Sequence, residues 1–294
     1  MQVADVVRVP SRPRLADVIA LGKPRLSMLV VCTAAAGIWL SPLPMVWWKA
    51  ILTLLATTVL VGCANAMNSY FERRTDAQMK RTRRRPLPAQ LIDPQAAMIS
   101  ALVLAGVSVA TLVWVANPVT AVLGFVAFAT YAFIYTPMKQ HSALALFVGG
   151  VPGAIPPLMG WTAATGRLDE VGIALFGILF FWQLPHFIAI SIYLGDDYER
   201  GGIKVFSNVY GATLTKLSIL LSTFALAGVS LSLVPLGVVS SFYGWGAALL
   251  GLGFTAWTLI GIRRMKLKAW GRRVFLGSLA YLTLLLAVLA VGAH

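Results

Sequence analysis

The chain is a succession of apolar runs, most of them about as long as a membrane is thick. A helix needs about 20 apolar residues to cross the hydrocarbon core of a bilayer. Hydrophobic residues make up 59% of the 294 residues and charged residues only 12%, which is too little charge for the surface of a soluble domain. The sequence therefore predicts an all-α polytopic membrane protein. We expect nine transmembrane helices, near residues 26–42, 48–69, 96–116, 118–137, 143–163, 170–193, 214–236, 241–262 and 274–292.

The basic residues are distributed unevenly between the two sides of this predicted bundle. Of the 24 lysines and arginines, only Lys49 and Arg167 fall on the side opposite to the N-terminus. Because cytoplasmic loops are rich in Lys and Arg, we expect a cytoplasmic N-terminus and a periplasmic or extracellular C-terminus. The same bias explains most of the formal charge of +14, so this charge does not indicate a nucleic-acid partner. We divide the chain into a cytoplasmic segment, 1–25, and one membrane domain, 26–294; the short N-terminus favours a bacterial inner membrane over an organelle.

The first polar motif follows the second apolar run and reads Asn68-x3-Glu72-x3-Asp76. If the helix continues through it, each four-residue step turns the chain by about 40° net, so the three side chains share one face. Carboxylate and amide oxygens suit Mg²⁺, which commonly links carboxylates to substrate phosphates. The bases after the motif can hold phosphate oxygens directly, although a basic cytoplasmic loop is expected here in any case. These bases are Lys80, Arg81, Arg83, Arg84 and Arg85.

A second acidic motif, "YLGDDYERGGIKVF" at 193–206, lies on the same predicted side. Asp196 and Asp197 are adjacent, so only one of them can point at a given metal ion. The pair Gly201-Gly202 permits a sharp turn or a close approach of the backbone to a ligand. Taken with the first motif, this segment predicts a two-sided diphosphate clamp in which two carboxylate sets hold metal ions.

Three further features lie inside or at the ends of apolar runs. Tyr135 and Lys139 are one helical turn apart, so both can face one cavity; an interfacial tyrosine and a snorkelling lysine are the simpler interpretation. His186, in "WQLPHF", is the one histidine within a predicted span, which makes it either a hydrogen-bonded structural residue or a functional one. The Gly- and Pro-rich "GGVPGAIPPLMGW" predicts an irregular backbone that is buried or lines a cavity.

Together these motifs resemble the UbiA-type family of intramembrane prenyltransferases over residues 20–290. The family's first motif, Asn-x3-Asp/Glu-x3-Asp followed by Met-x-Arg-Thr-x-x-Arg-Pro-Leu, reads here as Asn68, Glu72, Asp76 and "MKRTRRRPL". The segments "YTPMKQHS", "GAIPPLMGWTAATG", "WQLPHF" and "DDYERGGIKVF" are similar to the haem-specific branch. Two departures from the common pattern are Glu72, where many members carry Asp, and a second motif without the wide Asp-x3-Asp spacing.

The resemblance implies nine helices around a central cavity and a magnesium-dependent reaction. Farnesyl diphosphate would donate its farnesyl group to the vinyl group of haem b, with addition of water. The implied metal ligands are Asn68, Glu72, Asp76, Asp196 and Asp197. The implied diphosphate ligands are Arg81, Arg85, Lys139 and Lys204, with Tyr135 beside them. His186 would contact haem or handle a proton, and haem A synthase, which acts on the product, would be a partner.

Two other functions remain open at this point. The chain could be a prenyltransferase of the same superfamily with an aromatic acceptor such as a hydroxybenzoate, which product analysis would distinguish. It could also be a transporter or a haem-binding membrane protein without enzymatic activity. Transporters place polar sites near the middle of the bilayer, whereas the charges here gather at one face and the middle holds little beyond His186, which counts against transport.

Overall fold

The computed structural model describes residues 14–293. Residues 1–13 of the predicted segment 1–25, and His294, lie outside this part. The described residues form helices, and their only β-type pairing is an isolated bridge between Val239 and Ala293. The elements are α1 (Leu15–Leu21), α2 (Pro24–Leu40), α3 (Trp47–Gln78), α4 (Pro94–Val115), α5 (Pro118–Ala129), η1 (Thr130–Tyr135), α6 (Thr136–His141), α7 (Ala145–Thr165), α8 (Glu170–Tyr193), α9 (Gly195–Arg200), α10 (Phe206–Leu231), α11 (Ser241–Leu259) and α12 (Leu267–Gly292).

Every predicted span overlaps a helix or a continuous run of helices. In residues 14–293, six helical segments are long and apolar enough to cross a membrane: Trp47–Gln78, Pro94–Val115, Pro118–His141, Glu170–Tyr193, Phe206–Leu231 and Leu267–Gly292. The apolar part of α2, Ser27–Leu40, is shorter. The all-α, multi-pass membrane architecture is therefore confirmed, whereas the count of nine membrane crossings is not.

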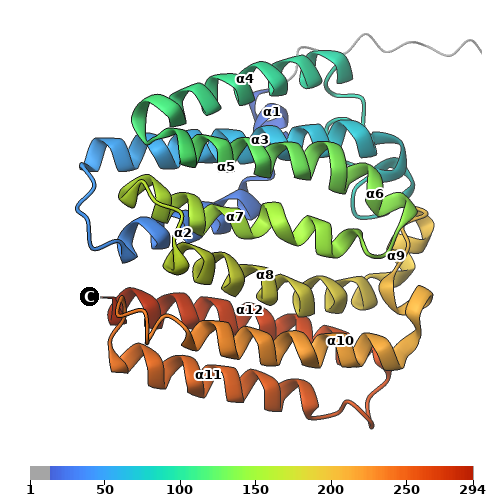
Figure 1. The fold of residues 1–294 in the computed structure, drawn as a ribbon. Coiled ribbons are helices and arrows are strands. Elements are labelled where there is room, and N and C mark those ends of the chain that lie inside the picture. The colour runs from blue at the N-terminus through green and yellow to red at the C-terminus, as the bar shows by residue number, and fades with distance from the viewer. Residues whose placement is uncertain (1–13, 294) are drawn as a thin grey trace, which may run out of the picture.

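The helices lie side by side in two groups that meet at α7 (Figure 1). In the first group α3 packs against α4, and α5 joins them through a core that includes Leu60, Met67 and Leu112. In the second group α8 packs against α10 and α12, and α11 covers them from outside. Because α7 contacts α2, α5 and α8, it connects the two groups.

The Gly- and Pro-rich segment does not form the irregular backbone that the sequence predicts. Residues 145–165 form the continuous helix α7, with Pro152, Pro156 and Pro157 inside it. Neighbouring helices can compensate for hydrogen bonds lost at proline in a membrane helix. The glycines instead bring helices together: a Cβ on Gly160 would lie 1.9 Å from the carbonyl oxygen of Ala34 in α2. Small residues allow this close approach of two helix backbones.

Helix α3 positions the polar motif at one end of the bundle. Its 32 residues span about 48 Å, well beyond the hydrocarbon thickness of about 30 Å. The helix therefore continues through Asn68, Glu72 and Asp76, as the sequence predicts. Segments 79–93 and 194–205, which carry the bases and the second acidic motif, lie at this same end, on the right in Figure 1, opposite to the C-terminus.

Candidate active site

Three buried side chains on one face of α3 form the centre of the polar cluster. Asn68, Glu72 and Asp76 are each no more than 3% exposed. Successive four-residue steps keep them on one side of the helix, toward η1 and α6. The Asn68 amide donates to Thr136 Oγ1 at 3.2 Å. The sequence-predicted first motif is thus assembled in one place, although burying carboxylates here requires positive partners.

A different base accompanies each of these three oxygen-bearing side chains. Lys23 Nζ donates to Asn68 Oδ1 at 2.5 Å, and Lys139 Nζ forms an ion pair with Glu72. Arg85 donates to Asp76 Oδ2 at 2.8 Å. The bases come from the α1–α2 connection, α6 and the loop after α3. The cluster therefore joins three segments that are distant in the sequence.

Lys23 is a site residue that the sequence analysis did not identify. Burial, followed by the positive charge of Arg85, lowers the pKa of Lys23 to about 7, while the charge of Glu72 acts in the opposite direction. The negative charge around the Lys23 ammonium is therefore too small to offset the effects of its burial and of Arg85. An anion placed beside Lys23 would favour its protonated form. A phosphate oxygen is the kind of group that this corner of the cluster can take.

The second acidic motif meets the first one through Asp197. This side chain is buried and accepts a hydrogen bond at 3.2 Å from the backbone N–H of Lys80, just beyond α3. Arg200 donates to the same oxygen at 2.8 Å, and this bond lowers the pKa of Asp197 below its usual range. Asp197 is consequently held ionised against the loop that follows the first motif.

Asp196 lies outside this cluster. Its exposed carboxylate pairs with Lys268 at the start of α12, at 2.6 Å, and that hydrogen bond lowers the pKa of Asp196 below its usual range. The neighbouring Glu199 is also exposed and accepts a hydrogen bond from Asn208. Of the two adjacent aspartates, Asp197 is therefore the one directed at the first motif.

The glycines of the second motif permit this contact. A Cβ on Gly201 would lie 2.9 Å from the sulfur of Met79 and 3.3 Å from a side-chain carbon of Thr75. Gly202 has φ of +67°, in the left-handed region that favours glycine. The segment can therefore turn closely over the end of α3.

Among residues 14–293, two buried carboxylate oxygens of the cluster have neither a hydrogen-bond partner nor an ion-pair partner. Asp76 Oδ1 and Asp197 Oδ2 are inaccessible and unbonded, although the other oxygen of each is engaged. Leaving charged oxygens unsatisfied is costly, so these atoms could accept a cation. Within residues 14–293, however, no three His, Cys, Asp or Glu side chains form a metal site by themselves. Magnesium fits only with further ligands such as Asn68, water and phosphate oxygens.

Two of the predicted diphosphate ligands are not in the cluster. Arg81 and Lys204 are exposed, and neither forms an ion pair with any described residue. Arg85 and Lys139, in contrast, contact Asp76 and Glu72 directly. The structure therefore separates the predicted bases into two that belong to the buried cluster and two that lie at the surface.

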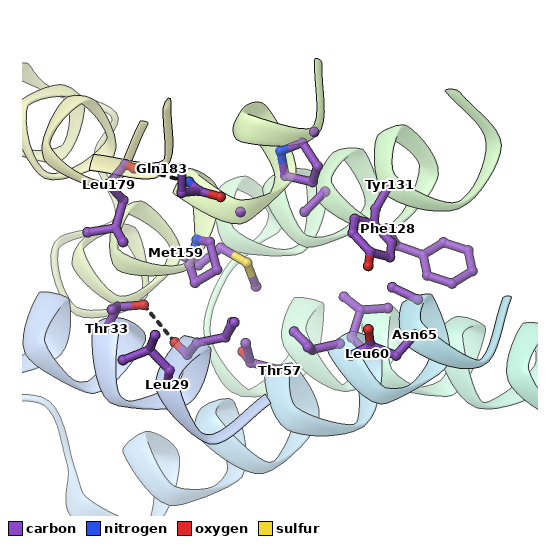
Figure 2. Close-up of a pocket in the computed structure, with 18 of the residues that line it drawn as sticks. Leu29, Thr33, Thr57, Leu60, Asn65, Phe128, Tyr131, Met159, Leu179 and Gln183 are labelled. Atoms are coloured by element: carbon purple, nitrogen blue, oxygen red, sulfur yellow. Dashed lines mark hydrogen bonds between the residues drawn. The ribbon is translucent and has the colours of Figure 1, made fainter. Parts of the chain in front are cut away.

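An apolar cavity of about 290 Å³ lies beside the cluster. On α3 the cavity is lined from Asn65, which is one helical turn from Asn68, to Thr57. The other walls come from α2, α5, η1, α7 and α8. Figure 2 shows Met159 near the middle of this lining and Leu60, Phe128 and Leu179 around it. Because its walls are almost entirely hydrocarbon and aromatic, the cavity suits an extended apolar chain.

A π-helical segment aims two tyrosines into the cavity. Pro137 cannot donate its backbone nitrogen and would clash with a preceding carbonyl in a regular α-helix. The preceding residues, Thr130–Tyr135, form the π-helix η1, and Thr136 Oγ1 donates to the Tyr131 carbonyl at 2.7 Å. Both Tyr131 and Tyr135 line the cavity. The Lys139 ammonium lies 5.7 Å from the Tyr135 ring centre, which links the cavity to the cluster.

Gln183 places a polar group on the otherwise apolar wall. Its Nε2 donates to the carbonyls of Gly150 at 3.2 Å and Leu179 at 3.1 Å. Its Oε1 lies against Gly153, where a Cβ would come within 2.0 Å of it. In Figure 2 the Gln183 amide faces the cavity. Glycine at position 153 therefore makes room for an amide whose orientation is set by two hydrogen bonds.

His186 lies one turn further along α8 and also lines the cavity. Its ring stacks on Trp182, with centres 4.7 Å apart, and contacts Phe275 at 4.9 Å. Its Nδ1 is 2.9 Å from Ser278 Oγ. Trp182, Phe275 and Ser278 therefore hold the ring in place, and the residue as a whole is only partly exposed. The structure thus brings the predicted histidine to the cavity wall, away from the contacts of the acid–base cluster.

The UbiA prenyltransferase family matches residues 29–290, which include the α3 motif, the cavity walls and the second acidic motif. The chain belongs to this family. The match covers the described membrane helices almost completely, so membership applies to the whole helical bundle and not to a fragment of it.

Close relatives carry one functional name. The chain is 52% identical over 275 residues to protoheme IX farnesyltransferase of Anaeromyxobacter dehalogenans, covering 94% of this chain and 93% of the relative. It is 44% identical over 285 residues to the protein of the same name from Myxococcus xanthus, covering 97% of both. The similarity extends over nearly the full length of each relative.

Solved structures share the fold at low sequence identity. Digeranylgeranylglyceryl phosphate synthase superposes with a TM-score of 0.82 at 14% identity, covering 95% of this chain and 98% of the other. A UbiA homologue from Archaeoglobus fulgidus bound to GPP and Mg²⁺ gives a TM-score of 0.72 at 15% identity, covering 93% and 99%. This chain therefore has the UbiA fold.

Proposed function

We propose that this UbiA-family protein transfers the farnesyl group of farnesyl diphosphate to the vinyl group of protohaem IX, with addition of water, giving haem O and diphosphate. The observation that carries the proposal is the position of the buried acid–base cluster at one end of an apolar cavity. An ionic head and a hydrocarbon tail match these two environments. The name shared by the relatives that are 44–53% identical supplies the acceptor and the prenyl length.

The diphosphate would bind by taking over bases that now serve the carboxylates. Lys23, Lys139 and Arg85 each contact one residue of the α3 motif. A small rotation of these long side chains would bring their donors to phosphate oxygens. Their positive charge would stabilise the leaving group as negative charge develops on it, which acts on the chemical step rather than on binding alone.

Magnesium would be held by Asn68, Glu72 and Asp76 on one side and by Asp197 on the other. When bound, it would neutralise diphosphate charge and so favour departure of the leaving group. The buried unpaired oxygens of Asp76 and Asp197 support this assignment. We assign the second side to Asp197 rather than Asp196, because Asp196 is engaged with Lys268 at the surface.

The prenyl tail would lie along α3, from Asn65 toward Thr57. The apolar walls would keep water from the allylic cation that forms when the C1–O bond breaks. Tyr131 and Tyr135 line the cavity at its end nearest the cluster, where their ring faces could stabilise positive charge. The tyrosines therefore connect diphosphate departure with protection of the cation.

The acceptor would approach from the side of α8 that carries His186. The vinyl group attacks C1 of the farnesyl cation, and the new cation on the porphyrin side is captured by water. One proton is released, so haem b, farnesyl diphosphate and water give haem O, diphosphate and H⁺. His186 would contact the haem, because it is part of the cavity wall that α8 supplies.

The cellular setting follows from the charges. The cluster lies at the end of the bundle that carries most of the loop bases, so we place that end, with the N-terminus, in the cytoplasm of a bacterium and the protein in its inner membrane. Haem A synthase, which would consume the product, is the partner that we propose for this membrane.

One assay tests the proposal. Purified protein in detergent is incubated with haem b, farnesyl diphosphate and Mg²⁺, and the products are separated by chromatography and identified by mass spectrometry. We expect a haem whose mass has increased by a farnesyl group and one hydroxyl group, and no product with EDTA. Prenylation of a hydroxybenzoate in place of haem would instead assign the chain to the aromatic-acceptor branch.

A further inference from the structure

Ser278 contacts the Nδ1 atom of His186 and does not itself line the cavity. It is on α12, is fully buried, and is absent from the cavity wall. Its hydroxyl oxygen lies 2.9 Å from His186 Nδ1 and 2.7 Å from the carbonyl oxygen of Phe275. Any influence of Ser278 on a molecule in the cavity must therefore pass through the histidine.

These two distances assign the hydrogens. Two oxygens 2.7 Å apart need a hydrogen between them, and the Phe275 carbonyl has none, so the Ser278 hydroxyl donates to it. That donation uses the one hydroxyl hydrogen. Ser278 Oγ can then only accept from His186, and so the hydrogen lies on Nδ1. In the neutral ring the other nitrogen, Nε2, carries a free lone pair.

The surrounding groups hold the ring that carries this lone pair. Trp182 covers one face of the His186 ring and Phe275 contacts it from α12. The Trp182 indole N–H donates to the Ser278 carbonyl at 2.6 Å, so the stacked tryptophan and the serine are joined. Within residues 14–293, Nε2 has no hydrogen-bond partner. Because His186 is part of the cavity wall, Nε2 is the ring nitrogen that is available to a bound molecule.

We propose that Ser278 is a positioning residue that holds His186 as its Nδ1–H tautomer, so that Nε2 presents a lone pair to the cavity and binds the iron of the haem substrate. A histidine that ligates a metal usually donates its other N–H to a partner that sets its tautomer and orientation. The assignment of iron as the ligand rests on the proposed function. The tautomer does not, because it follows from contacts within the protein.

The first experiment tests the tautomer without substrate. The intact protein is labelled with ¹⁵N-histidine, placed in nanodiscs and examined by NMR, and the signal of His186 is identified by its loss in His186→Asn. The chain has 3 histidines, so the spectrum is simple. We expect the Nδ1–H form in the wild type and a mixture of tautomers in Ser278→Ala. An Nε2–H form in the wild type would overturn the inference.

The second experiment tests the iron. Haem b alone is titrated into the purified variants, and its absorption and resonance Raman spectra are recorded. We expect a histidine-ligated spectrum in the wild type, its loss in His186→Asn, and affinity about 10- to 100-fold weaker in Ser278→Ala. Ser278→Thr, which keeps a hydroxyl, should restore most of the affinity. Ser108→Ala removes a buried hydroxyl bonded only to its own helix and should have no effect.

The outcomes separate the inference from the proposed function. Formation of farnesylated haem with no histidine signature in the haem spectrum would overturn iron ligation by His186 and leave the reaction intact. Equal haem affinity of Ser278→Ala and wild type would likewise overturn the positioning role. Failure of the proposed function, in contrast, appears as absence of the haem product from the wild type, and the ligand-free NMR result stands independently of that assay.

Discussion

Asp197 accepts a hydrogen bond from the backbone N–H of Lys80 at 3.2 Å, and this contact joins two residues that are 117 positions apart in the sequence. A backbone donor survives every substitution at position 80 except proline, which has no backbone N–H. The geometry between the two acidic motifs is therefore set by the path of the chain and by Asp197 itself, and the following predictions test how far activity depends on it.

Asp76→Asn should lower the rate of diphosphate release by about 100- to 1,000-fold. The substitution removes the charge that holds Arg85 and the buried oxygen available to magnesium. Asp93→Asn is a matched control. Asp93 is the N-cap of α4 and lies in the segment between α3 and α4, and asparagine is an equally good N-cap. Enzyme-coupled diphosphate detection measures both. Equal rates for the two variants would remove Asp76 from the proposed site.

The adjacent pair of aspartates gives an internal comparison. Asp197→Asn should reduce turnover by about 100-fold or more, since it removes the ionised group that contacts the first motif. Asp196→Asn should retain nearly full turnover, because exposed ion pairs such as Asp196–Lys268 contribute little. A larger loss for Asp196→Asn than for Asp197→Asn, measured as farnesylated haem per minute, would reverse our assignment.

Lys23→Met should raise the KM for farnesyl diphosphate by about 10- to 100-fold, the effect of losing one hydrogen bond to a charged group. Stability should not fall, because the ammonium is buried with too little negative charge around it. Lys23→Arg should retain most of the affinity. Lys49→Met, at the opposite end of α3, is the control. An unchanged KM in Lys23→Met would exclude Lys23 from diphosphate binding.

Gly153→Ala should displace the Gln183 amide and destabilise the protein by about 1–3 kcal/mol through overpacking. Gly106→Ala offers the contrast: no atom lies within 4 Å of the added carbon, so this helical position should gain about 0.5–1 kcal/mol. Thermal unfolding in detergent reports both. A Gly153→Ala variant as stable as Gly106→Ala would show that Gln183 moves freely.

The sequence predicted those features that depend on neighbours in the chain. Asn68, Glu72 and Asp76 share a face because helical spacing alone requires it, and the hydrophobic runs marked where helices lie. Lys23 could not be found in this way, because its partner is 45 residues away. Arg81 and Arg85 looked equivalent in a basic run. The turns after α3 place the Arg85 guanidinium against Asp76 and leave Arg81 at the surface.

The prolines in the sequence were poor predictors of local helix geometry. Three prolines predicted an irregular backbone in α7, yet the helix continues through them because neighbouring helices enclose it. A single proline after Tyr135 accompanies a π-helix that no periodicity analysis would detect. Ser278 shows no local signal of any kind, since a serine in an apolar helix is common and only its contact with His186 reveals a role.

The pairing of bases with the α3 motif has a thermodynamic consequence. Because Lys139 and Arg85 already neutralise Glu72 and Asp76, a metal ion that arrives alone adds positive charge to a site whose carboxylates are already balanced. A diphosphate that arrives alone must withdraw bases from carboxylates that then stand uncompensated. Each ligand relieves the penalty created by the other, so their affinities should be reciprocally coupled. The site would thus respond weakly to free magnesium or free diphosphate and strongly to both together.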